Sequence, residues 1–176
     1  MARRTKTYIA GDWDNDYDAV EQLRKWNDGK YWSLSFVDAH DMTQSSDASQ
    51  NCSIKKSLAL RMDASKTFVL IVGDKTASLR SGSCSYCDSY SAYSHSCMRG
   101  NGVSMKSFIE YECEKAKRDD LKIVVLYYAA AVDRDKCPDV LRWSGVHAPM
   151  LKRMNGELYW DCLLYTSPSP RDQRGS

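Results

Sequence analysis

Long apolar segments are missing from the sequence. No window approaches the ~18 consecutive apolar residues that a membrane-spanning helix requires. The basic residues at positions 3, 4 and 6 are not followed by the apolar segment of a secretory signal. We therefore expect a cytoplasmic protein without a membrane partner.

A strong net charge is also missing. The formal net charge is +2 at pH 7, so the chain creates no field that would draw it to a polyanion. Nucleic acid is therefore not an expected partner. With 43% hydrophobic residues, 176 residues are enough for one globular domain that buries roughly two thirds of the surface its unfolded chain would expose.

Cysteine, by contrast, is present seven times. An even number of cysteines and a secretory signal would indicate a disulfide framework, and the chain has neither. We expect reduced thiols or a metal site instead.

Apolar runs predict the strands. Residues 67–73 and 121–128 form two nearly continuous apolar runs rich in β-branched side chains, which is typical of strands buried on both faces. Shorter runs at 7–11 and 33–38 predict two more strands. A further strand is expected at 157–160, with no helix after it.

Amphipathic segments lie between these strands, at 17–27, 54–62 and 107–118, and they predict helices. A further helix is expected after the strand at 121–128. Alternating strands and helices favour an α/β fold with a parallel sheet covered on both faces. In such sheets small ligands bind at the carboxyl ends of the strands, where Asp12, Asp38 and Asp74 are expected.

The C-terminal residues differ from the rest. Residues 162–172 resemble the translation of a sequencing-library adapter. We expect a domain at 1–161, interrupted near Trp160-Asp161, and a non-native or disordered tail at 162–176. An ordinary disordered tail rich in proline and serine is the alternative.

The order of segments over residues 54–128 carries a resemblance to a known family. A helix with a basic face is followed by the strand Ser65–Gly73, a loop, and Tyr111-Glu112 leading into the next strand. This order resembles the TIR-like proteins of bacterial Thoeris-type defence, and the similarity extends from about residue 6 to about residue 160. The resemblance implies a flavodoxin-like, three-layer sandwich with a parallel sheet of about five strands.

The resemblance also implies an activity and its catalytic residue. Many TIR enzymes cleave the nicotinamide–ribose bond of NAD, and Thoeris members produce an ADP-ribose-type signal that activates a separate effector protein against phage. Their catalytic glutamate lies four residues after a tryptophan. Phe108 stands at the tryptophan position here, so Glu112 is the expected catalytic carboxylate. From the residues alone, Glu112 could instead cap or salt-bridge a neighbouring loop, while Glu110 and Glu114 are expected in water.

Substrate contacts are expected in two loops. Asp12, Trp13 and Asp14 follow the first strand, where an indole can stack on adenine and carboxylates can accept hydrogen bonds from ribose. The alternative is that this acidic turn, through Asp14 or residue 15, only caps the next helix. Asp38 and His40 follow the second strand, in a loop that the resemblance also links to self-association.

Residues 80–104 form an insert rich in serine, glycine and cysteine, which we expect near the site as a candidate lid. Cys84, Cys87, His95 and Cys97 are ligand types that zinc prefers, although the spacing of the second pair is unusual. Free or redox-active thiols and a cysteine pair are the alternatives.

Three functions compete at this point. An NAD-consuming enzyme is favoured by Glu112. A non-catalytic nucleotide-binding or protein-interaction module is compatible with Phe108 in place of tryptophan. A phosphoacceptor receiver is disfavoured, because Gly73 ends the third strand where an acceptor aspartate is expected.

Overall fold

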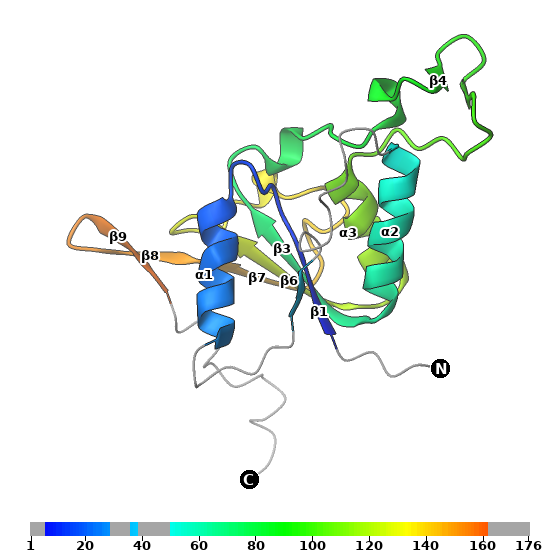
Figure 1. Cartoon of the computed structure of the whole chain (residues 1–176). Helices are drawn as coiled ribbons and strands as arrows, with labels where there is room; N and C mark the ends of the chain where they lie inside the picture. The colour runs from blue at the N-terminus through cyan, green and yellow to red at the C-terminus, as the bar shows by residue number, and fades with distance from the viewer. Residues whose placement is uncertain (1–5, 29–35, 39–49, 162–176) are drawn as a thin grey trace.

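The centre of the molecule is a parallel sheet of five strands (Figure 1). The computed structural model describes residues 6–28, 36–38 and 50–161. The strands lie in the order β2-β1-β3-β6-β7, and every neighbouring pair is parallel. Their bounds are β1 Lys6–Ala10, β2 Phe36–Asp38, β3 Ser65–Val72, β6 Lys122–Tyr127 and β7 Val146–Pro149. This is the flavodoxin-like order, with the chain reversing direction across the sheet between β1 and β3, and it confirms the predicted fold class.

Helices cover both faces of the sheet and complete three layers (Figure 1). Helix α1, Tyr17–Asp28, packs on one face, while α2, Asn51–Asp63, and α3, Phe108–Arg118, pack on the other. Successive strand residues alternate between the two cores, so Phe68 contacts the α2–α3 side and Val69 the α1 side. This two-sided burial explains why the predicted strands are continuously apolar.

A capping box fixes the start of α3. The Ser107 hydroxyl accepts a hydrogen bond from the Glu110 backbone N–H at 3.1 Å, and Glu110 Oε2 accepts one from the Ser107 backbone N–H at 2.7 Å. Glu110 is therefore a structural residue and not the water-exposed carboxylate we expected. Glu114 fits that expectation better, since its half-exposed side chain pairs with Lys106.

The region after β6 differs from the prediction. The expected α-helix is absent from the described residues, which form a short 3-10 turn, η3 Arg134–Lys136, and then the edge strand β7. Strand β9, Glu157–Trp160, does not join the parallel sheet but pairs antiparallel with β8, Leu151–Met154. Asn155 and Gly156 connect them with φ angles of 51° and 85°, as a tight hairpin turn requires.

The insert at residues 80–104 projects from the body beside α2 (Figure 1). It follows the turn η1, Thr76–Ser78, and contains η2, Cys84–Tyr86, and the small ribbon of β4, Tyr90–Ser91, and β5, Ser96–Cys97. Among the described residues, no helix is long and apolar enough to cross a membrane. The proposed tail at 162–176 lies outside the described residues.

Candidate functional site

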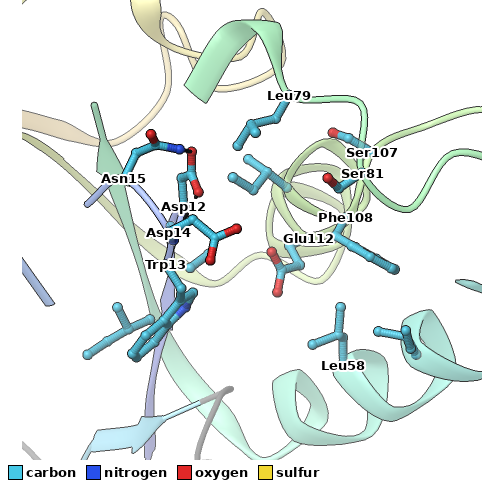
Figure 2. A pocket seen from close by; sticks show the side chains of 15 residues that line it. Asp12, Trp13, Asp14, Asn15, Leu58, Leu79, Ser81, Ser107, Phe108 and Glu112 are labelled. Carbon is cyan, nitrogen blue, oxygen red and sulfur yellow. Dashed lines mark hydrogen bonds between the residues drawn. The ribbon is translucent and has the colours of Figure 1, made fainter. Parts of the chain in front are cut away.

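A cavity of about 280 Å³ opens at the carboxyl end of β1 (Figure 2). It lies where the strand order reverses between β1 and β3, which is where ligands bind in open α/β sheets. Its walls come from the loop after β1, helices α2 and α3, and the segment after β3. Beyond Ile9 and Ala10 of β1, the lining residues are Gly11, Asp12, Trp13, Asp14, Asn15, Ile54, Leu58, Leu79, Ser81, Ser107, Phe108, Ile109 and Glu112.

Glu112 lies on the wall of this cavity, on the second turn of α3. Its side chain is only 5% exposed, and Figure 2 shows its carboxylate facing the loop that carries Asp12 and Asp14. The Tyr8 hydroxyl donates a hydrogen bond to Glu112 Oε1. Glu112 does not cap α3, because Ser107 and Glu110 do so.

Burial dominates the protonation of Glu112. Removal from water disfavours the charged form and raises the pKa of Glu112 to about 7, although the Tyr8 hydrogen bond and the positive charge of Arg61 act in the opposite direction. Near neutral pH the residue therefore exists in both protonation states. A carboxyl group with this property in a cavity is a candidate for chemistry.

Asp12 organises the loop after β1. It is 6% exposed, its Oδ2 accepts a hydrogen bond from Asn15 Nδ2 at 2.5 Å, and its Oδ1 accepts one from the Asp14 backbone N–H at 3.2 Å. Asp12 therefore stabilises the turn that follows β1. A contact between Asp12 and ribose stays a prediction.

Trp13 and Asp14 both line the cavity, as expected of substrate-binding residues. The Arg24 guanidinium lies over the Trp13 ring, 5.3 Å from its centre, and so covers one face of the indole. Asp14 is exposed. The structure brings both residues together with Glu112, but their role toward adenine or ribose stays a prediction.

Asp38 and His40 are less well defined. Asp38 ends β2 and pairs in register with Ile9, so its backbone lies at the same end of the sheet as the cavity. His40 lies outside the described residues.

Asp16 is a buried acidic residue that sequence analysis did not select. It directly precedes α1 and is 3% exposed, and its Oδ2 has no hydrogen-bond partner among the described residues. Burial, reinforced by the charge of Asp12, raises the pKa of Asp16 to about 6. A Cβ added at Gly73 would lie 1.9 Å from Asp16 Oδ1, which explains the glycine directly after β3.

The four predicted zinc ligands all lie in the insert, but the structure does not bring them together around a common point. Cys84 is buried and its sulfur accepts a hydrogen bond from the Ser104 backbone N–H at 3.3 Å, while His95 Nδ1 lies 3.2 Å from the Tyr90 hydroxyl. Cys87 and Cys97 are free thiols. Within the parts of the chain that the structure describes, no three His, Cys, Asp or Glu residues are grouped as a metal site. Zinc binding stays a prediction.

Sequence analysis also missed Tyr8 and Arg61. Both act on Glu112, Tyr8 from β1 and Arg61 from α2. The sequence of β1 does not single out Tyr8, because the neighbouring Thr7 also carries a hydroxyl group. The partner of Tyr8 is 104 residues away, so no local pattern relates the two.

The sheet order, with a carboxylate-lined cavity at its reversal, defines a flavodoxin-like α/β domain. Residues 8–81 match the family model described as Thoeris protein ThsB, TIR-like domain. With the fold, this match supports a Thoeris-type TIR-like protein and an involvement in anti-phage defence. The matched stretch includes Asp12, Trp13 and Asp14 and ends before Glu112. A comparison with curated proteins found no match.

Proposed function

We propose that this protein is an NAD-processing enzyme that cleaves the nicotinamide–ribose bond and produces an ADP-ribose-type signal for a downstream effector protein. The observation that carries the proposal is the buried Glu112 carboxyl in the cavity at the sheet reversal. Resemblance to TIR enzymes supplies the reaction, and the cavity supplies independent support.

The charge of the cavity favours the nicotinamide end of the dinucleotide. Three carboxyl groups line it, those of Asp12, Asp14 and Glu112, and none of the described lining residues is basic. Such a wall attracts the cationic pyridinium ring and repels phosphate. The volume of about 280 Å³ lies near the lower end of the range for ligand pockets, which suits one end of NAD better than the whole molecule.

The diphosphate of NAD would then lie outside the part of the cavity that the three carboxyl groups line. Lys75, in the segment after β3, donates a hydrogen bond from its Nζ to Asn15 Oδ1 at 3.0 Å, and this contact is exposed. Asn15 lines the cavity, so Lys75 lies beside its edge. A lysine there can offset the charge of a diphosphate whose nicotinamide riboside end is inserted toward Glu112.

The reaction requires little further machinery. When the C1′–N bond breaks, its electron pair stays with nicotinamide and neutralises the ring, while positive charge develops on the ribose. An ionised Glu112 facing that ribose stabilises the developing charge from a buried position, where screening by water is weak. A water molecule or a hydroxyl of the same ADP-ribose then bonds to C1′ and loses its proton.

Incubating the purified chain with NAD and measuring nicotinamide release tests the proposal. Glu112→Gln keeps the size of the side chain but cannot ionise, and it is expected to lower the rate at least 100-fold. Glu114→Gln is the matched control on the same helix and is expected to leave the rate within twofold. Equal rates for wild type and Glu112→Gln would reject the catalytic role.

The competing function is a nucleotide-binding module without chemistry, with which Phe108 in place of tryptophan is compatible. Calorimetric titration with NAD separates it from the enzyme. Binding without nicotinamide release, equally strong in wild type and in Glu112→Gln, is the result expected of such a module.

A further inference from the structure

Tyr8 connects the central sheet to the cavity wall. It lies in the middle of β1, is fully buried, and its ring stacks on Phe68 with centroids 5.8 Å apart and planes 13° apart. Its hydroxyl reaches across the core to Glu112 Oε1 on α3. A phenol in this position links a residue fixed by the sheet to a carboxyl group that faces the cavity.

The contact leaves one carboxyl oxygen for a ligand. Tyr8 donates to Oε1, and Figure 2 shows the carboxyl group of Glu112 directed at the cavity. Ring stacking restrains the Tyr8 side chain, so the hydrogen bond also restrains the rotamer of Glu112. Pre-positioned charge of this kind needs no reorganisation when positive charge develops on a substrate.

We propose that Tyr8 is a positioning residue, which orients Glu112 through Oε1 and favours its ionised form. This inference rests on the proposed function for its effect on catalysis. Its effect on the proton affinity of Glu112 is independent of any activity.

The other groups that face Glu112 are few. Arg61 acts from α2, Asp12 and Asp14 lie across the cavity on the loop after β1, and Cys113 follows on α3 itself. Tyr8 is the group among the described residues that gives the carboxyl a hydrogen bond. Because a donor to the carboxylate lowers its pKa, loss of the hydroxyl raises the pKa of Glu112 above its value of about 7.

The test is Tyr8→Phe, which removes one oxygen and keeps the ring and its stack on Phe68. The pH profile of kcat/KM for nicotinamide release is expected to shift to higher pH, with a value on the order of tenfold lower at pH 7 and recovery at alkaline pH. Tyr127→Phe is the matched control. Tyr127 is buried in the same core, but its hydroxyl lies 2.8 Å from His147 Nδ1 rather than on Glu112.

A second measurement needs no activity. The infrared carbonyl stretch of a protonated carboxyl, assigned by its loss in Glu112→Gln, is followed as the pH is raised. Its midpoint is expected to be higher in Tyr8→Phe than in wild type or Tyr127→Phe. An unchanged midpoint overturns the positioning role, whereas a shifted midpoint in a protein that releases no nicotinamide overturns only the proposed function.

Should Tyr8→Phe fold poorly, a double-mutant cycle with Glu112→Gln keeps the inference testable. The effects of the two substitutions on the unfolding equilibrium constant are expected not to multiply, because each removes the same contact. Independent effects would contradict the proposal.

Discussion

Glu112 is held in a balance of opposing interactions. Burial alone pushes its carboxyl toward the protonated form, and Tyr8 and Arg61 push it back. An enzyme that relies on an ionised carboxylate gains from this arrangement, because an inserted cation can complete the ionisation at little cost. The same burial means that ionisation of Glu112 lowers the stability of the folded state.

The stability of the fold is therefore expected to depend on pH through Glu112. Its pKa is about 7 in the folded state against 4.5 in the unfolded chain, so the folded state binds the proton more tightly. This contribution is complete below pH 4.5 and is lost as the pH rises to about 7, by about 3 kcal/mol in the free energy of unfolding. Urea denaturation between pH 4 and 8 measures it.

Glu112→Gln is expected to remove most of this pH dependence of the free energy of unfolding. The smaller dependence caused by Asp16 remains, because its raised pKa acts in the same direction up to about pH 6. A wild-type protein whose stability rises from pH 5 to pH 7 would show that these two carboxyls do not control it.

At the scale of elements, the β8–β9 hairpin follows β7 and projects from the body of the molecule, contacting the α1 side of the core at its base (Figure 1). Trp160 stacks on Tyr128 with ring centroids 5.4 Å apart and meets Trp26 edge-on at 6.2 Å. These aromatic contacts fasten the base of the hairpin to the α1 side of the core. An isolated two-stranded hairpin is marginal in water, so its order depends on this attachment.

Trp160→Ala is expected to lower the free energy of unfolding by about 2 kcal/mol, because it deletes a partly buried ring and both aromatic contacts. Faster amide hydrogen exchange in β8 should accompany the loss. Tyr159→Ala, at an exposed neighbouring position, should stay within about 0.5 kcal/mol of wild type. Similar losses for both variants would mean that the ring contacts of Trp160 do not hold the hairpin.

The insert is fastened at both ends to the beginning of α2. Asn51 Nδ2 donates to the Ser83 carbonyl at 3.0 Å, and the buried Lys55 ammonium donates to the carbonyls of Ser104 at 3.3 Å and Lys106 at 2.7 Å. These contacts hold the ends of the insert beside Ser81 and Ser107, which line the cavity. A change within the insert can therefore reach the site through its two ends.

We propose that the insert at residues 80–104 binds zinc, and elemental analysis of the purified protein tests this proposal. One zinc per chain, lost in Cys84→Ser and retained in the control Cys52→Ser, is the expected result. Binding would require the Cys84 sulfur to leave the Ser104 N–H and His95 Nδ1 to leave the Tyr90 hydroxyl. A metal-free protein that folds normally would leave the thiol alternatives.

The sequence predicted those elements that are defined by neighbouring residues, and it missed those that are defined by contacts between distant residues. The apolar runs of β3 and β6 and the stripe of α3 are local patterns, and they were correctly predicted. Strand β7 is short and has no regular apolar pattern, so its sequence does not predict a strand. Its pairing with β6 defines it. The Asn155-Gly156 turn was a usable hairpin signal that the strand prediction for 157–160 overlooked.

At the scale of the whole molecule, the site is a product of topology. Reversal of the strand order between β1 and β3 separates the helices that follow them and opens the cavity between α2, α3 and the loop after β1. The placement of Asp12, Trp13, Asp14 and Glu112 around one cavity followed from this rule together with the family resemblance. The contact between Tyr8 and Glu112 did not, because it depends on how α3 packs on the sheet.

Topology, charge and burial together predict that NAD binding is linked to a proton. A cationic ring beside Glu112 stabilises the carboxylate, so binding should release a proton wherever the free residue is still protonated. The affinity for NAD should accordingly rise by up to tenfold per pH unit below about pH 7 and level off above it. Calorimetric titrations at pH 6, 7 and 8 in buffers of different ionisation enthalpy measure both the affinity and the proton released. Glu112→Gln should bind with a flat pH profile and no Glu112-linked proton, and a wild-type affinity that falls as the pH rises would contradict insertion of the cationic end into this cavity.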